Sequence, residues 1–161
     1  MSHDIRRTAL KVVLPVSQFI STIHMPFSHK LITGKEYYAL REWLEPGDII
    51  LTRTRGELAN VFIPGFWTHA GVYVGNMALS PFPETVAEAT ASRGAVGTDL
   101  ISFLVSKDYI RIVRPQFADA LQRQSAAGWA AAAIGSPYDW MFESPSDSRA
   151  FYCFELAALA Y

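Results

Sequence analysis

The sequence predicts one α+β domain, in which helices pack on an antiparallel sheet. Half of the 161 residues are apolar and 18% are charged, which is enough apolar material for a compact core. Short segments rich in β-branched and aromatic residues cluster mid-chain, between helix-like segments at both ends. A single cysteine excludes an intramolecular disulfide and, with four scattered histidines, a cysteine-rich zinc site.

The elements follow in chain order. A helix is expected over 36–44, where apolar residues share one face, and Pro46-Gly47 ends it. Turn residues bound strands expected over 48–52, 68–75, 86–90 and 109–113. Asp99 is expected to cap a short helix over 100–106. An alanine-rich helix over 117–134 should end at Gly135, and a last short helix should cover 151–161.

An N-terminal extension, residues 1–44, is expected to precede a domain over 45–161, and charge is uneven along the chain. The net charge of −1 gives no general attraction to nucleic acid. Residues 1–35 nevertheless carry five basic side chains against one acidic one. Their apolar stripe has helical spacing and consists of Val12, Val16, Phe19, Ile20 and Ile23. We expect this stripe to pack on the domain, and docking on a membrane surface or a protein partner is the alternative.

Neither a membrane span nor an export signal is evident in the sequence. The best apolar stretch, residues 9–23, is interrupted by polar residues and by Pro15, and no small-x-small cleavage site follows it. The expectation is therefore a cytoplasmic protein.

Cys153 is the first candidate for chemistry. It falls in the first turn of the last expected helix, where the helix dipole favours the thiolate. A buried cysteine that packs as a small hydrophobe is the alternative. His69 begins an expected strand and shares a face with Gly71 and Tyr73, and Gly71 is expected to leave space beside the imidazole. Histidine is the side chain best suited to activate a thiol near neutral pH.

Glu88 is the candidate for orienting that imidazole. It lies between Ala87 and Ala89, so a carboxylate here needs a partner, and the Nδ1–H group of His69 would suit it. An outward-facing glutamate on an edge strand is the alternative.

Five short segments resemble one enzyme group. Residues 46–51, PGDIIL, and 68–75, THAGVYVG, resemble two strands of NlpC-like papain-fold hydrolases. Residues 135–139, GSPYD, and 152–156, YCFEL, resemble the motifs of the circularly permuted YiiX/YebB-like branch, related to lecithin retinol acyltransferase. Residues 86–90, VAEAT, are similar to the strand that holds its polar third residue. Histidine precedes cysteine here, as that branch requires.

The resemblance implies a circularly permuted papain-like fold and a cysteine peptidase or amidase without metal or organic cofactor. Cys153 would attack the carbonyl, His69 would take and return the proton, and Glu88 would fix the imidazole. The Cys153 backbone N–H would donate to the oxyanion, while Tyr73 and Tyr138 are expected to contact substrate. Phe154 replaces the serine that usually follows the cysteine, so that hydroxyl is absent.

The substrate is the least constrained expectation. A cell-wall peptide or related amide is favoured. A lipid acyl hydrolase or transferase is the alternative, and Phe62, Ile63, Phe66 and Trp67 before the histidine favour it. A lipid- or partner-binding module without turnover remains as a non-enzymatic alternative.

Overall fold

The structure is a computed structural model that describes residues 34–57, 60, 63, 65–76, 84–105, 107–140 and 150–161. Residues 1–33, which contain the apolar stripe and most of the basic N-terminal side chains, lie outside the described residues, and so does Phe62. Packing of that segment on the domain therefore stays a prediction. None of the helices in the described ranges has the length and apolar character needed to cross a bilayer.

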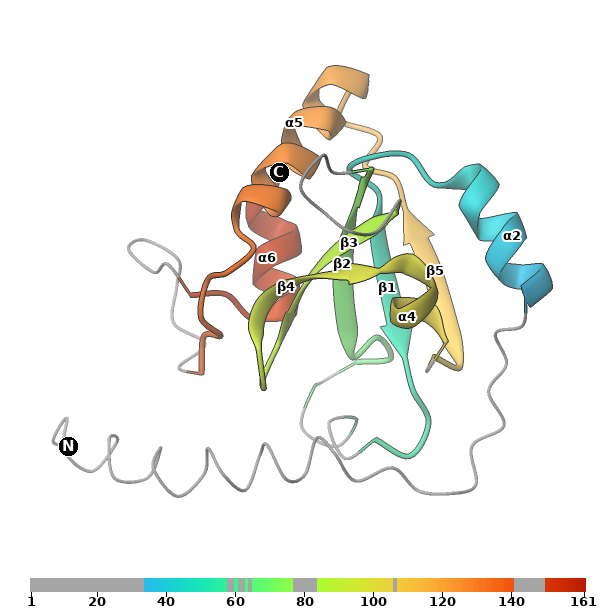
Figure 1. Cartoon of the computed structure of the whole chain (residues 1–161), viewed down its shortest axis with the longest axis vertical. Coiled ribbons are helices and arrows are strands. Elements are labelled where there is room, and N and C mark those ends of the chain that lie inside the picture. The colour runs from blue at the N-terminus through green and yellow to red at the C-terminus, as the bar shows by residue number, and fades with distance from the viewer. Residues whose placement is uncertain are drawn as a thin grey trace, which may run out of the picture.

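Helices flank a central group of strands, as expected (Figure 1). The elements in order are α2 (Gly34–Trp43), β1 (Ile49–Arg53), β2 (His69–Gly75), β3 (Thr85–Thr90), β4 (Gly94–Asp99), α4 (Leu100–Leu104), β5 (Tyr109–Val113), α5 (Ala120–Ala132) and α6 (Cys153–Leu159). The Asp99 cap is confirmed, because its carboxylate accepts a hydrogen bond from the Ser102 N–H group.

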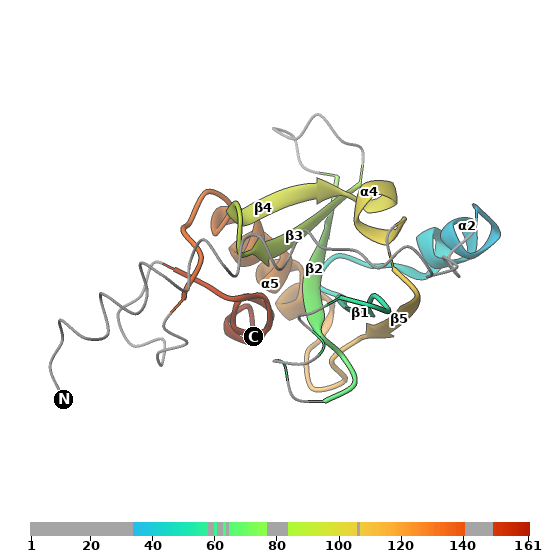
Figure 2. The same cartoon turned by 90° about the horizontal axis from the view of Figure 1, so that it is seen from below.

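The five strands form one sheet in the order β4-β3-β2-β1-β5, and every neighbouring pair is antiparallel. The α+β class with an antiparallel sheet is thus confirmed. β2 occupies the centre, while β4 and β5 form the edges. In both views α2 lies beside the β5 edge (Figures 1 and 2).

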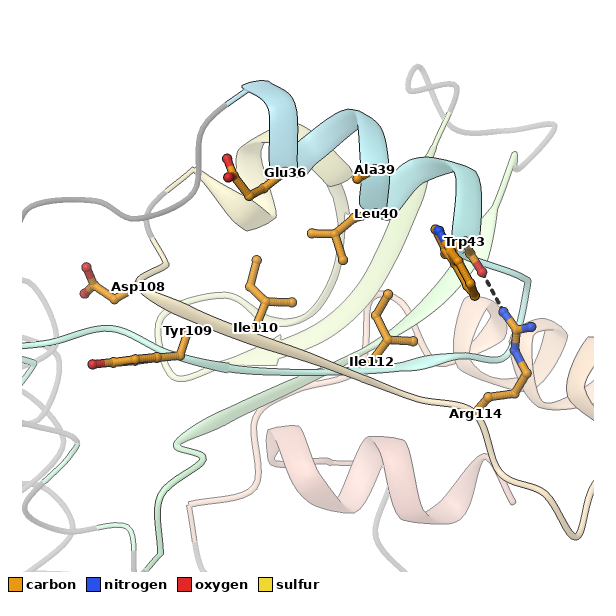
Figure 3. A pocket seen from close by; sticks show the side chains of 9 residues that line it. All are labelled: Glu36, Ala39, Leu40, Trp43, Asp108, Tyr109, Ile110, Ile112 and Arg114. Carbon is orange, nitrogen blue, oxygen red and sulfur yellow. Dashed lines mark hydrogen bonds between the residues drawn. The ribbon is translucent and has the colours of Figure 1, made fainter.

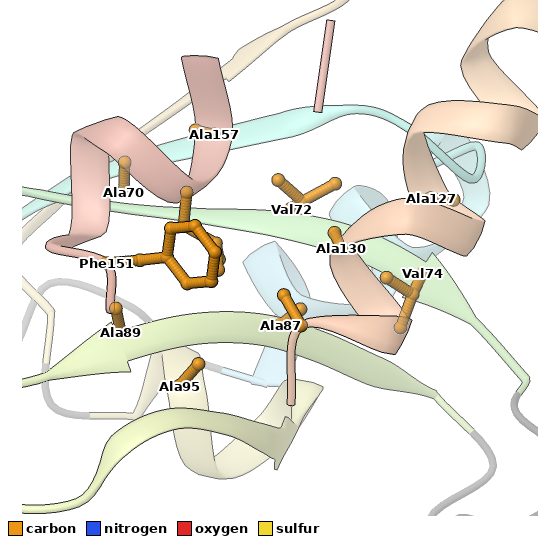
Figure 4. Close-up of a cluster of buried hydrophobic side chains, with 12 residues drawn as sticks. Ala70, Val72, Val74, Ala87, Ala89, Ala95, Ala127, Ala130, Phe151 and Ala157 are labelled. Carbon is orange, nitrogen blue, oxygen red and sulfur yellow. The ribbon is translucent and has the colours of Figure 1, made fainter. Parts of the chain in front are cut away.

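One face of the sheet packs against α5 and α6. Alternate residues of β2, namely Ala70, Val72 and Val74, join alanines of β3, α5 and α6 in a buried cluster (Figure 4). Leu156 and Ala157 anchor α6 in the same cluster. Because most of these side chains are alanines, the helices approach the strands closely. The predicted alternation along β2 is confirmed.

The opposite face of β2 carries a second cluster, built with α4. Tyr73 packs there with Ile50, Val86, Leu100, Phe103 and Leu104. A Cβ atom at Gly71 would lie 2.6 Å from Val86 Cγ1 and 3.1 Å from Phe103 Cε2. The expectation that Gly71 leaves open space beside the imidazole is therefore wrong: its missing side chain lets Phe103 approach the sheet.

Strand β4 was not predicted, because its sequence, GAVGTD, combines two glycines with an aspartate. It forms by pairing along its whole length with β3. The two longest predicted helices are shorter than expected. α5 starts at Ala120, where Asp119 and Gln122 form a capping box, and α6 covers only Cys153–Leu159.

A hollow of about 710 Å³ lies between α2 and β5 (Figure 3). Leu40 and Trp43 of the helix face Ile110 and Ile112 of the strand across it. Neither His69 nor Cys153 lines this hollow.

Asp48 ties the end of α2 to the sheet at that hollow. Its buried carboxylate accepts hydrogen bonds from Arg114 Nε at 2.8 Å and Nη2 at 2.7 Å, and from the Glu45 N–H group at 2.9 Å. Arg114 Nη2 also donates to the Trp43 carbonyl at 2.6 Å. The aspartate of the PGDIIL motif thus has a structural role in joining α2, β1 and β5.

We predict that Asp48→Ala lowers the free energy of unfolding by about 3 kcal/mol, because it removes one partner of a buried ion pair. Such a change usually costs about 3–5 kcal/mol. The lower end of that range applies here, because the Arg114 side chain is 35% exposed and can be hydrated. Arg111→Ala, at an exposed position of β5, is the control and should change the free energy of unfolding by less than about 0.5 kcal/mol. Urea unfolding measures both, and equal losses would contradict this role for Asp48.

Candidate active site

Cys153 is the first residue of α6, and the packing of that helix fixes its position. Tyr152 caps the helix: its N–H donates to Glu155 Oε2 at 3.3 Å, and its carbonyl accepts from the Leu156 N–H at 2.9 Å. The thiol itself is buried. It accepts hydrogen bonds from the backbone N–H groups of Ala70 and Phe154 and contacts the His69 imidazole.

His69 begins β2 at the end of the sheet that α6 reaches. Its side chain is 18% exposed, so the imidazole is both supported by protein and accessible. The Phe103 ring packs beside it, with ring centroids 5.8 Å apart. The structure therefore brings together the histidine and the cysteine from opposite ends of the domain sequence.

The two groups change each other's protonation. Burial by itself raises the pKa of the Cys153 thiol, but hydrogen bonds from His69, Ala70 and Phe154 outweigh it and lower that pKa below its ordinary value. Burial lowers the pKa of His69, but the contacts with Cys153 and Glu88 outweigh it and raise the pKa to about 9. Both shifts favour a thiolate beside an imidazolium at neutral pH.

Glu88 holds the other side of the imidazole. His69 Nε2 lies 2.6 Å from Glu88 Oε2, and the Thr98 hydroxyl donates to Glu88 Oε1 at 2.5 Å. Burial by itself raises the pKa of Glu88, but these hydrogen bonds and the Lys107 charge outweigh burial and lower that pKa below its ordinary value. The expected pairing is therefore present, but through Nε2 rather than Nδ1. Since Nε2 contacts the carboxylate, Nδ1 is left to face Cys153.

These residues open into a cavity of about 220 Å³. Its lining consists of Glu57, Ile63, Thr68, His69, Glu88, Ala89, Thr90, Ala91, Lys107, Tyr138 and Cys153. No group of three or more His, Cys, Asp or Glu side chains suited to a metal ion occurs within the described ranges.

Tyr138 reaches this cavity from the loop after α5. The Asp139 N–H donates to the Phe151 carbonyl at 3.2 Å, and the Phe151 N–H donates to the Pro137 carbonyl at 3.1 Å. This short parallel bridge places Tyr138 beside the start of α6. Burial, followed by the charges of Cys153 and Asp139, raises the pKa of Tyr138, so its phenol stays protonated and can donate a hydrogen bond.

Tyr73 does not reach the cavity. Its side chain is 7% exposed and packs in the second core cluster, on the α4 face of β2. The expectation that Tyr73 contacts substrate is corrected accordingly. Period-two alternation placed it on the His69 face, but four residues beyond His69 that face of β2 is core.

Three contributors to the site were not predicted from the sequence. Thr98 lies on the unpredicted strand β4, Lys107 stands in the turn before β5, and the Ala70 N–H donates to the thiol from the backbone of β2. Backbone donors carry no sequence signal. Recognition of β4 as a strand would have put Thr98 on the same face as Val96, which pairs with Glu88.

Residues 43–161 match the sequence model of the permuted papain-like amidases, the YaeF/YiiX or C92 family. The chain belongs to this family. Searches of curated proteins and of solved structures give no significant match. As a permuted papain-like amidase, the protein is a cysteine-peptidase-type hydrolase, and the family match covers every element from β1 to α6.

We predict that Cys153 reacts with iodoacetamide at pH 6 roughly tenfold or more faster than a free cysteine, whose pKa is about 8.5. The lowered pKa of Cys153 means that the rate falls only when the pH drops through that lowered value, where the thiolate is protonated. His69→Ala removes the imidazolium, so burial should move the inflection to alkaline pH and abolish the advantage.

Mass spectrometry of the alkylated protein over a pH series measures both rates. Thermal unfolding of His69→Ala serves as the control for the fold. Equal rate profiles for the two proteins would show that His69 does not activate this thiol.

Proposed function

We propose that this amidase cleaves a peptide-type amide with Cys153 as the nucleophile and His69 as the general acid and base. The contact between the thiol and the imidazole is the observation that carries the proposal. An NlpC-type version of the papain-like fold, with the hydrolase domain spanning 45–161, is part of it. The antiparallel sheet and the family match over 43–161 support this.

The reaction begins with attack of the Cys153 thiolate on the carbonyl carbon, which forms a C–S bond and a tetrahedral oxyanion. His69 then gives its proton to the amide nitrogen as the C–N bond breaks, and the amine leaves a thioester on Cys153. In the second half, His69 takes a proton from water while the oxygen attacks the thioester. Collapse releases the carboxylic acid and restores the thiolate.

Two donors are available for the oxyanion. The Cys153 N–H belongs to the first turn of α6, where backbone N–H groups have no partner one turn earlier. The Tyr138 hydroxyl is the second, because it lines the cavity beside Cys153 and stays protonated. Both donors are held in place before substrate arrives, which is the condition for effective stabilisation of the transition state.

Glu88 acts through the histidine. Its carboxylate fixes the ring by the 2.6 Å contact with Nε2, and its charge supports the imidazolium that forms during each half of the reaction. Thr98 holds the carboxylate in turn. The ring therefore keeps Nδ1 directed at the nucleophile.

The cavity favours a peptide-type amide over a long acyl chain. At about 220 Å³ it is smaller than the 300–1,000 Å³ typical of pockets for drug-sized ligands. Glu57, Thr68, Thr90 and Lys107 are among the residues that line it, so polar groups are available to an amide substrate. Of the four apolar residues that favoured a lipid substrate, Ile63 lines the cavity, while Phe66 packs against Trp67 and Tyr109.

We expect turnover of short peptide amides but not of long-chain acyl esters, and loss of turnover in Cys153→Ala. The pH profile of kcat/KM should be bell-shaped, because it reports the ionisation of the free enzyme. Its acid limb reports protonation of the thiolate, and its alkaline limb, near pH 9, reports loss of the His69 proton needed by the leaving amine. A substrate panel analysed by mass spectrometry checks this. Turnover confined to acyl esters would favour the lipid alternative, and binding without turnover would favour a non-enzymatic module.

Tyr138→Phe should lower kcat about 10²–10³-fold, the usual loss for one oxyanion donor, with little change in KM. The phenyl ring keeps the packing, so the fold should be preserved. Tyr73→Phe is the matched control, because Tyr73 lies in the core outside the cavity, and its kcat should stay within about twofold. Steady-state kinetics on the best peptide substrate compares them, and equal kcat values would exclude Tyr138 as a donor.

A further inference from the structure

Lys107 is a cavity residue for which the reaction described above has no use. The backbone around it is fixed from both sides. Its N–H donates to the Leu104 carbonyl at 3.0 Å, the Asp108 N–H donates to the Arg53 carbonyl at 3.0 Å, and the Asp108 carboxylate accepts from the Arg55 N–H at 2.6 Å. The turn between α4 and β5 thus holds Lys107 in a defined place at the wall of the cavity.

The ammonium group of Lys107 lies near the reacting residues. Its Nζ atom is 5.7 Å from the centroid of the Phe103 ring, which is a cation–π distance. The same buried ring packs against His69. The Lys107 charge also acts on Glu88. Phe103 therefore packs against both the imidazole and the ammonium group.

The charged side chains that line the cavity differ in whether they already have a partner. Glu88 is paired with His69 and bonded to Thr98, and Glu57 has an interaction of its own. Within the part of the chain that the structure describes, Lys107 forms no ion pair with a carboxylate within 4.0 Å. A cation held beside a nucleophile in this way is suited to an anionic group on the bound molecule.

We propose that Lys107 determines specificity by binding a carboxylate of the substrate, so that the amides cleaved best carry a free carboxylate close to the scissile bond. This inference rests on the proposed function and names its substrate class. A carboxylate suits the site because the cavity is small and because peptides carry that group on acidic side chains and at their C-termini. Ammonium binds it as a point charge, without the fixed fork of a guanidinium.

A pair of thiol reagents tests this without a known substrate. Iodoacetate and iodoacetamide alkylate the same sulfur and differ by one carboxylate. We expect Lys107→Met, which keeps an unbranched apolar stem, to lower the ratio of the iodoacetate rate to the iodoacetamide rate about fivefold. Lys107→Glu should lower it further, and the ratio of the two rates cancels any change in the reactivity of the thiolate itself.

Lys35→Met is the matched control, because Lys35 lies on α2 and does not line the cavity. It removes the same charge from the protein and should leave the ratio unchanged. An unchanged ratio in Lys107→Met would overturn the proposal, and so would an equal fall in Lys35→Met, which would reflect net charge alone.

The same variants can be compared on peptide substrates that differ only in a carboxylate or carboxamide next to the scissile bond. Lys107→Met should lower kcat/KM for the carboxylate form about fivefold more than for the carboxamide form. Equal kcat/KM losses for both forms would also overturn the proposal. Failure of the underlying function is distinguishable, because it would appear as a Cys153 that reacts with neither reagent at pH 6 and cleaves neither peptide.

Discussion

The contact between the Cys153 thiol and the His69 imidazole is the interaction on which the rest of the site depends. It joins the first residue of α6 to the first residue of β2, so it exists only if that helix is seated at that end of the sheet. The alanine-rich cluster of α5, α6 and the central strands provides this seating, because small side chains allow a close approach. The apolar packing of the alanine-rich cluster thus sets the position of the thiol relative to the imidazole.

Burial of three ionisable groups in one place explains the hydrogen bonds that surround them. A thiolate, an imidazolium and a carboxylate are each unfavourable in a poorly hydrated environment unless they are paired. Glu88 is held by His69 and Thr98, and Cys153 is held by His69 and by two backbone N–H groups. Each charge therefore has its partner before substrate binds, which is the preorganisation that an amidase requires.

The two faces of the sheet contribute different parts of the site. The face covered by α5 and α6 provides Cys153, the proposed nucleophile, and, through the loop after α5, Tyr138. The opposite face provides His69, Glu88 and Thr98, whose side chains are linked by hydrogen bonds across β2, β3 and β4, and Phe103 of α4 packs beside the imidazole. The site lies where the two layers meet at the end of β2, which gives substrate access to both. The larger hollow beside β5 lies away from this junction.

The sequence by itself determined the α+β class, the position of most elements, and the pairing of a cysteine, a histidine and a glutamate. Those predictions rest on local signals: residue periodicity, turn residues, caps and short motifs. Only the tertiary structure decided the remaining features. Strand β4 forms although GAVGTD has low strand propensity, because β3 offers a complete pairing partner. Contacts across strands decided that Nε2 faces Glu88, that Gly71 makes room for Phe103, and that Tyr73 is core while Tyr138 is not. Such choices depend on residues far apart in the chain, and no local pattern encodes them.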